Sequence, residues 1–258
     1  MNYKLHQLKG YIQTIYIVEE NGSLLLLDGC CRPDVAIIND YIENQLGKTL
    51  KDLKLVISTH AHPDRVGGLS YFKKLGVTVA GPQGLNDWYS GITGLFTYCV
   101  DIFLTYMVAV NKKRGFKNVL FPRQTDLDLV LREGMRVPGF ESWEILETSG
   151  HTDIDLTIYH SDTKLAYVAD NFIGSPKFTA RPYPLFNPSE YKKSLKRYID
   201  LEISDFLIAH YGRVTIPKER IQRLIDSTPQ RPRRHITTLP SILLMLARTA
   251  IKKITRPS

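Results

Sequence analysis

The chain has 258 residues, 43% of them hydrophobic, with 34 Lys and Arg against 26 Asp and Glu. A chain of this length and composition can bury a substantial core within one soluble domain. Residues 1–6 lack the apolar run of a secretory signal, so we expect a cytoplasmic protein. The three cysteines, Cys30, Cys31 and Cys99, suit a reducing compartment, because adjacent cysteines rarely pair and one is left over. We expect all three to be small buried side chains.

Apolar runs alternate with helix-like segments along the chain, without internal repeats. Residues 11–18 and 24–27 flank Asn21-Gly22, a dipeptide that tolerates positive φ and predicts a hairpin. Further strands are expected at 55–57, 77–79, 126–131, 143–148, 155–160, 165–169 and 205–209, and helices at 35–46, 69–75, 187–202 and 217–227. This order predicts an α/β (α+β) domain with two facing sheets and helices outside, a four-layer αββα sandwich.

A histidine-rich motif follows the strand predicted at 55–57. His60, His62 and Asp64 are spaced two residues apart, so in extended backbone the two imidazoles point the same way and can bind one ion. Asp64 is then free to face a second ion. Neutral imidazole and carboxylate are ligands that Zn²⁺ accepts, at about 2.0–2.2 Å. The glycine pair at 67–68 is expected to let the backbone turn tightly beneath the metal.

Three more residues of metal-binding type follow predicted strands. His151, Asp170 and His210 each lie just past the end of an apolar run. Strand ends present side chains rigidly to a shared cleft, so we expect these residues to join the motif at 60–64.

On these motifs the chain resembles the metallo-β-lactamase superfamily over roughly residues 11–225. The resemblance implies the αββα sandwich of that superfamily and two zinc sites. It assigns His60, His62 and His151 to the first zinc, and Asp64, Asp170 and His210 to the second.

Arg65 departs from the pattern of most hydrolytic members, such as glyoxalase II and the lactonases, which carry a histidine there. A guanidinium has no lone pair to donate, so we expect one tightly bound Zn²⁺ and a second bound more weakly. Many true zinc β-lactamases share the arginine. They resemble one another, however, in having a cysteine where this chain has Asp170 and often a lysine where it has Ile173. Lys177 lies nearby in sequence and is a candidate to bind a substrate carboxylate.

Two further residues are candidates for the surroundings of the metals. Asp28 ends a predicted strand, and the resemblance implies that it lies near the site and orients a ligand imidazole. An ordinary strand-end turn is the alternative. Tyr211 directly follows His210 and is, with Arg65 and Lys177, a candidate for the substrate pocket.

Residues 91–110 are almost wholly apolar and carry a single charge, Asp101. Their length alone would suit a membrane span. They lie between metal motifs that must stay on one side of a membrane, however, so we expect no span. Members of the superfamily often carry a helical insertion that overhangs the cleft, and we place one at about 83–115. It forms either a hydrophobic pocket wall, favouring an apolar or acyl-bearing substrate, or a helix buried against the core.

The net charge is concentrated near the C-terminal end. Residues 213–258 hold eleven Lys or Arg and two Asp or Glu, a net charge of +9, whereas residues 1–212 carry −1. We divide the chain into a catalytic domain at 1–230 and a basic amphipathic extension at 231–258. The helix expected at 239–254 either lies on an anionic membrane surface or docks on its own domain or a partner subunit. Basic charge alone does not predict nucleic-acid binding, and we expect no such partner.

The sequence therefore predicts a zinc-dependent hydrolase with a small-molecule substrate. A zinc-bound hydroxide would attack the carbonyl of an ester, lactone, thioester or amide, since zinc lowers the pKa of its water to about 7. Asp64 is the expected catalytic residue, which orients the hydroxide and accepts its proton. The alternatives are a phosphodiesterase or nuclease that uses the same metals as a clamp on phosphate, and a metal-binding or membrane-surface module with little turnover. Neither the substrate nor the oligomeric state follows from the sequence.

Overall fold

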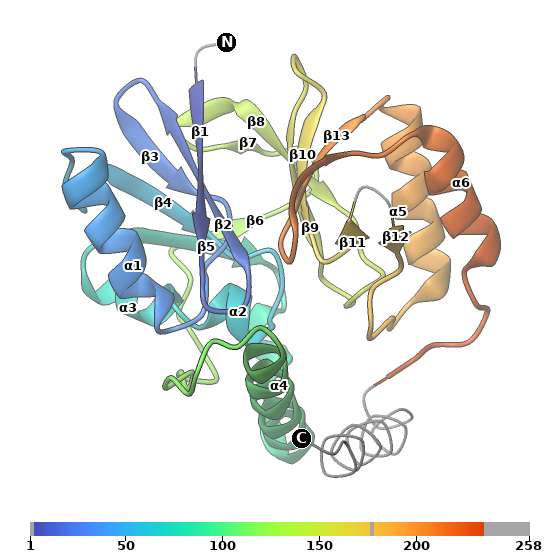
Figure 1. Cartoon of the computed structure of the whole chain (residues 1–258), viewed down its shortest axis with the longest axis horizontal. Helices are drawn as coiled ribbons and strands as arrows, with labels where there is room; N and C mark the ends of the chain where they lie inside the picture. The colour runs from blue at the N-terminus through green and yellow to red at the C-terminus, as the bar shows by residue number, and fades with distance from the viewer. Residues whose placement is uncertain (1–2, 176–177, 235–258) are drawn as a thin grey trace, which may run out of the picture.

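The computed structural model describes residues 3–175 and 178–234. Two six-stranded sheets face each other, with helices outside them (Figure 1). The first sheet has the order β1 (Tyr3–Lys9), β2 (Thr14–Glu20), β3 (Ser23–Leu26), β4 (Leu53–Ile57), β5 (Thr78–Pro82) and β6 (Leu129–Leu131). The second has the order β14 (Gly212–Thr215), β13 (Asp205–Ile208), β10 (Leu165–Ala169), β9 (Leu156–His160), β8 (Phe140–Glu147) and β7 (Arg136–Val137). A separate short pair consists of β11 (Ile173–Ser175) and β12 (Phe178–Ala180).

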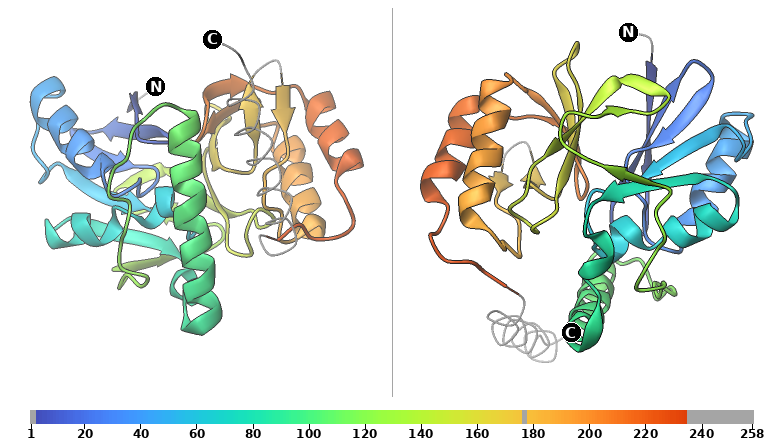
Figure 2. Two further views of the ribbon diagram at one scale, coloured as in Figure 1. Left: turned by 60° about the horizontal axis from the view of Figure 1, so that its bottom comes forward. Right: turned by 180° about the vertical axis from the view of Figure 1, so that it is seen from behind.

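Helices cover the outer face of each sheet (Figure 1). The helices of the first sheet are α1 (Asp34–Asp40), the π-helical turn η1 (Tyr41–Gln45), α2 (Pro63–Val66) and α3 (Leu69–Lys74). The helices of the second are α5 (Pro188–Asp200) and α6 (Lys218–Ser227). The 3₁₀ turn η2 (Leu85–Asp87) leads into α4 (Gly91–Asn111), which contacts α2 at the edge of the sandwich (Figure 2).

The central strands are buried on both faces because their apolar residues run without interruption. In β2, Ile15 and Ile17 pack toward the helices of the first sheet, whereas Tyr16 and Val18 face the second sheet. Alternate residues of β10 divide in the same way between the centre and the layer of α5 and α6. Continuous apolar runs are typical of strands covered on both sides. The predicted four-layer αββα sandwich is confirmed.

Several strands end at the same edge of the sandwich, so the loops that follow them lie close together. Strands β3, β4 and β5 are parallel neighbours, and β10 is parallel to β13. Their carboxyl ends, together with the loop after β8, open beside α4. The candidate metal ligands lie in these loops, except Asp64, which lies in the first turn of α2.

Helix α4 is long and apolar enough to cross a membrane by length and composition alone, yet only a third of its most apolar stretch is buried. One face packs on the domain through Val100, Ile102 and Ala109. Asp101 lies on that buried face and accepts a hydrogen bond from the Tyr89 hydroxyl at 2.9 Å. The helix is therefore packed on the domain beside the site.

Local predictions and observations agree where the sequence pattern is strong. Asn21 and Gly22 have φ of 50° and 81°, which confirms the hairpin. Strands β1, β7 and β14, which lie at sheet edges, and the short strands β11 and β12 are not predicted. The expectation for Cys99 is wrong: this side chain is exposed on α4, whereas Cys30 and Cys31 are buried. The helix expected at 239–254 lies outside the described residues.

Candidate metal centre

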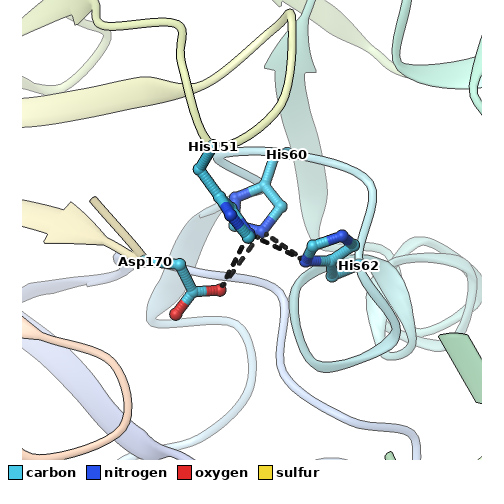
Figure 3. A group of neighbouring side chains, drawn as sticks. All are labelled: His60, His62, His151 and Asp170. Carbon is cyan, nitrogen blue, oxygen red and sulfur yellow. Dashed lines mark hydrogen bonds and ion pairs between the residues drawn. The ribbon is translucent and has the colours of Figure 1, made fainter. Parts of the chain in front are cut away.

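Four side chains converge at the edge of the sandwich: His60, His62, His151 and Asp170 (Figure 3). The Nδ1 of His62 lies 3.1 Å from the Nε2 of both His60 and His151. Asp170 Oδ2 lies 3.3 Å from His60 Nε2 and 3.7 Å from His151 Nε2. Two ligands about 2.0–2.1 Å from one ion in tetrahedral geometry lie roughly 3.3 Å apart, so these spacings suit one ion the size of Zn²⁺.

Hydrogen bonds fix which nitrogen of the imidazole carries the proton in two of these histidines. His151 Nδ1 donates to the carbonyl oxygen of Pro184 at 2.8 Å, and a carbonyl can only accept. Thr59 donates its hydroxyl to Asp28, so the same oxygen accepts from His60 Nδ1 at 3.1 Å. Each Nε2 therefore keeps its lone pair and faces the cluster. This is the tautomer in which a neutral imidazole binds a metal.

Asp28 reaches the site through Thr59. Its Oδ1 accepts from the Thr59 backbone N–H at 3.0 Å, and its Oδ2 accepts from the hydroxyls of Thr59 and Tyr167, each at 2.8 Å. The structure thus places one residue between Asp28 and the imidazole of His60. Its geometry fits an orienting carboxylate better than an ordinary strand-end turn.

Close backbone packing shapes the motif loop. His62 is extended, with φ −70° and ψ 153°, and Pro63 begins α2, which turns Asp64 toward the cluster. The glycine pair expected to allow a tight turn has ordinary right-handed backbone angles, with φ −90° at Gly68. Glycine is needed there because a Cβ would lie 2.4 Å from the carbonyl oxygen of Gly29, in the loop after β3.

Unusual backbone conformations aim two of the ligands. Ala169 has φ 47°, and the register between β10 and β13 shifts beside it, so the chain turns sharply and presents Asp170 to the cleft. Gly150 has φ 151° directly before His151. A Cβ on Gly150 would lie 2.5 Å from the Tyr191 Cβ of α5, so this loop is pressed against the helix layer.

Asp64, His210 and the second oxygen of Asp170 form an adjoining group. His210 Nε2 lies 3.4 Å from Asp64 Oδ2 and 3.3 Å from Asp170 Oδ1. Its Nδ1 donates to the carbonyl oxygen of Ile12 at 3.1 Å, which leaves the Nε2 lone pair facing the carboxylates. Asp64 Oδ2 is buried and accepts no hydrogen bond from any residue that the structure describes. This donor set suits a second ion that shares Asp170 with the first.

Arg65 reaches the same carboxylates and is fully buried. Its Nη2 donates to Asp170 Oδ1 at 2.8 Å, its Nη1 lies 3.2 Å from Asp64 Oδ2, and its Nε lies 3.2 Å from Asp28 Oδ2. Burial is the largest single effect and would raise the pKa of Asp170, but Arg65 together with His210 and His60 outweighs it and holds that pKa well below its usual range. One arginine thus lies within 3.2 Å of three buried carboxylates and stabilises their negative charge.

The two buried histidines titrate in opposite directions. Burial, and then the neighbouring His60, lower the pKa of His151. Burial is also the largest effect on His60 and acts to lower its pKa, but the hydrogen bond to Asp170 and the charges of Asp155 and Asp170 together outweigh it, and the pKa of His60 is raised. Because its pKa is raised, His60 binds a second proton more readily as the pH falls, and a metal must displace that proton. Metal affinity is therefore expected to fall at low pH.

A cleft of about 110 Å³ opens over the two groups. Its apolar wall is formed by Ile12, Leu104, Val108, Ile173 and Pro184. Two of these residues belong to α4, which packs a different face on the domain. The two expected roles of the insertion, pocket wall and core helix, therefore apply to different faces of one helix.

The remaining candidate residues are placed differently. Tyr211 does not line this cleft: it is 47% exposed and lies in a neighbouring hollow with Lys112 and Arg114. His210 lines both hollows, whereas Tyr211 lines only the second. Lys177 lies outside the described residues.

Asp155 is a member of the site that sequence reasoning missed. Its Oδ1 accepts from the Thr152 hydroxyl and lies 3.7 Å from His60 Nδ1. Its Oδ2 accepts from the Thr152 backbone N–H at 2.7 Å, which fixes the loop that carries His151. The signal for it in the sequence is Thr152, directly after His151, with Asp155 three residues further on.

An αββα sandwich with a His₃Asp group at its edge defines a metal-binding domain of the metallohydrolase type. The family model described as "Metallo-beta-lactamase superfamily" matches residues 8–210. The chain belongs to the metallo-beta-lactamase superfamily.

Individual relatives are distant. The chain is 25% identical over 239 residues to the probable metallo-hydrolase YqjP of Bacillus subtilis (strain 168), covering 84% of this chain and 72% of YqjP. The fold is similar to that of the metallo-beta-lactamase family protein TTHA1429 of Thermus thermophilus, with a TM-score of 0.63, 22% identity and coverage of 95% and 83% of the two chains. It is also similar to FIM-1 of Pseudomonas aeruginosa in a mono-zinc form, with a TM-score of 0.56, 16% identity and 83% coverage of both chains.

Proposed function

We propose that this protein is a zinc-dependent hydrolase that cleaves an ester, lactone, thioester or amide. The observation that carries the proposal is the convergence of His60 Nε2, His62 Nδ1 and His151 Nε2 on the carboxylate of Asp170. The name of YqjP, a probable metallo-hydrolase, and the mono-zinc form of FIM-1 support the same chemistry.

The first ion would be held by the three histidines, with Asp170 between it and a weaker second site. When bound, Zn²⁺ supplies a Lewis acid and lowers the pKa of a water to about 7. Asp64 orients the attacking water through Oδ2, which accepts no hydrogen bond from the described residues, and takes its proton. Pro184 and Thr59 hold the imidazoles of His151 and His60 in the binding tautomer throughout.

The surroundings of Arg65 favour carbonyl chemistry over phosphodiester cleavage. A two-metal clamp on phosphate needs two well-held ions. Here the guanidinium donates to Asp170 Oδ1 and lies 3.2 Å from Asp64 Oδ2, so it competes for both carboxylates of the second site. The apolar wall formed with Leu104 and Val108 suits a substrate with an apolar or acyl portion.

A substrate panel tests the proposal. The zinc-loaded full chain is assayed with carboxylic esters, lactones, a thioester, nitrocefin and a bis-aryl phosphodiester, and again after chelation and zinc readdition. We expect zinc-dependent hydrolysis of at least one carbonyl substrate. Turnover of the phosphodiester alone would make the protein a phosphodiesterase, and zinc binding without any turnover would make it a binding module.

A further inference from the structure

Helix α4 is apolar on more of its surface than an ordinary surface helix. A helix on a soluble domain buries its apolar stripe and exposes its polar one. In α4 the buried face holds Val100 and Ile102 together with Asp101, yet the exposed face also carries large apolar side chains, Ile92, Phe96 and Phe103. These exposed apolar residues indicate that this face has a partner of its own.

The exposed residues form one continuous stripe. Ile92, Phe96, Cys99, Phe103 and Val110 are spaced three, four or seven residues apart, which places them on a single side of the helix. The exposed fractions are 89% for Ile92, 49% for Phe96, 39% for Phe103 and 56% for Val110. Large apolar side chains gathered in this way mark an interaction surface.

The loop that follows α4 extends this surface and gives it a charge. Phe116 is 80% exposed and stacks on Tyr106 of α4, with ring centroids 4.2 Å apart. Residues 102–125 contain five Lys or Arg and no Asp or Glu. The loop is fixed to α4, because Tyr98 donates its hydroxyl to the Phe121 carbonyl at 3.0 Å and accepts from the Phe121 N–H at 3.1 Å.

We propose that this surface, the exposed stripe of α4 with the basic loop at 112–123, binds an anionic phospholipid membrane. Exposed apolar side chains flanked by Lys and Arg are the features of segments that insert shallowly into a charged bilayer. The helix lies on the membrane rather than across it, since its Asp101 face stays packed on the domain.

Charge favours an anionic membrane over two other possible partners of this surface, a second copy of the chain and the chain's own C-terminal residues. A second copy of the chain would bring two loops of the same sign together. The chain's own residues 235–258 hold four Lys or Arg and no Asp or Glu, so they repel the loop too. An anionic membrane attracts both basic segments.

The arrangement also places the membrane beside the cleft. Leu104 and Val108, on a different side of α4 from the stripe, line the cavity over the metal group. A membrane on the stripe therefore lies one helix diameter from the site, about 10 Å. Amphiphilic substrates could then enter the cleft from the bilayer surface.

The exposed thiol provides a probe at the centre of the stripe. Cys99 is exposed, whereas Cys30 and Cys31 are fully buried, so a thiol-reactive environment-sensitive fluorophore labels Cys99 selectively in the folded chain. The labelled full chain is titrated with vesicles of phosphatidylcholine, with or without phosphatidylglycerol. We expect a blue shift only with the anionic vesicles, and its loss at high salt. Co-sedimentation of unlabelled protein provides an independent readout.

Matched variants separate this surface from general charge effects. Lys113→Glu with Lys117→Glu should weaken binding to anionic vesicles roughly tenfold or more. Ile92→Ser with Phe116→Ser should weaken it as well, at little cost in folding because both side chains are exposed. The controls are Lys51→Glu with Lys54→Glu at the far end of β4, and Leu75→Ser at the end of α3. We expect the controls to bind like the parent.

Three results would overturn the proposal. The first is no binding to anionic vesicles, or binding that the stripe and loop variants leave unchanged. The second is a Cys99 that resists thiol reagents in a monomer without vesicles, which would show that the chain covers its own stripe. The third is a doubled mass by light scattering together with a concentration-dependent shift of the Cys99 label in the absence of lipid, which would identify a second copy as the partner.

Discussion

Arg65 and Asp170 form a buried ion pair, with Nη2 of the arginine 2.8 Å from Oδ1 of the aspartate. The other oxygen of Asp170 faces His60 and His151. Asp170 therefore contacts both the first metal group and Arg65. The guanidinium of Arg65 lies among Asp64 and Asp170, which are candidate ligands of the second ion. Arg65 supplies positive charge to the second group without supplying a ligand.

The metal content of the purified protein should reflect this asymmetry. We expect one zinc per chain to survive extended dialysis and a second to bind only at higher free zinc, because the ion must compete with Arg65 for Asp64 and Asp170. Elemental analysis before and after dialysis measures the stoichiometry. Two equally retained ions would show that Arg65 moves aside at no cost, and none would refute the site.

Replacing the arginine should separate its two roles. Arg65→His should tighten second-metal binding, since it removes the competing charge and restores a nitrogen donor, and calorimetric titration measures the change. Without metal the variant should lose about 3–5 kcal/mol of unfolding free energy, because buried carboxylates such as Asp28 lose their cation.

Arg65→Lys is the matched control for this substitution. It keeps the charge and should leave the second site weak. Equal second-metal affinity in the His and Lys variants would show that charge at position 65 does not govern occupancy.

Thr59 offers a test of how Asp28 acts on the site. Thr59→Val keeps the side-chain shape but removes the oxygen that accepts from His60 Nδ1, so we expect zinc affinity to fall about 10- to 100-fold. Competition with a chromogenic chelator measures it. Thr78→Val, at the far end of β5, is the control and should bind zinc like the parent. If both variants bind zinc normally, Asp28 has no orienting role.

Asp64→Asn should reduce kcat about 10²- to 10⁴-fold with little change in KM, because the carboxylate handles the proton of the water rather than the substrate. The assay uses the best substrate of the panel, with zinc content measured on the same sample. Asp153→Asn, on the exposed part of the loop after β8, is the control. A normally zinc-loaded Asp64 variant with near-parental kcat would rule out the proposed role.

The fold and the ligand positions follow from the sequence because they depend on local patterns. Uninterrupted apolar runs mark strands covered on both faces, and His60, Asp170 and His210 each follow such a strand, whereas His151 follows β8, in which apolar and polar residues alternate in part. What the sequence could not show depends on contacts between distant segments. The position of Arg65 among three carboxylates is set by packing between loops, and no local pattern encodes it.

The same reasoning explains the errors. An apolar run at 91–110 predicts a helix but not which of its sides is covered, and Cys99 lies on an exposed side. Tyr211 is predicted to line the substrate pocket because it follows His210, but it lines the neighbouring hollow. Thr59 and Asp155 lie beside motif residues, and their role is visible only once the hydrogen bonds are known.

Asp34 should make the stability of the protein depend on pH. Its side chain is fully buried in α1 and accepts a hydrogen bond from the Tyr11 N–H at 2.7 Å. Burial raises its pKa to about 7, against the opposing effect of the Tyr11 and Cys31 backbone bonds. Between about pH 4 and pH 7 the carboxyl of Asp34 is therefore protonated in the folded chain and ionised in the unfolded chain. Stability is therefore lost as pH rises from about 4 to 7, by on the order of 4 kcal/mol at most.

Asp34→Asn removes this ionisation and retains an oxygen for the Tyr11 N–H. We expect the variant to gain stability relative to the parent as pH rises from 5 to 8, as measured by urea unfolding midpoints at constant metal content. Asp52→Asn is the control of opposite sign: hydrogen bonds from Thr49 lower the pKa of Asp52, so its removal should bring no such gain. A parallel pH dependence in the Asp34 variant and the parent would show that the carboxyl of Asp34 is ionised in the folded chain at little cost.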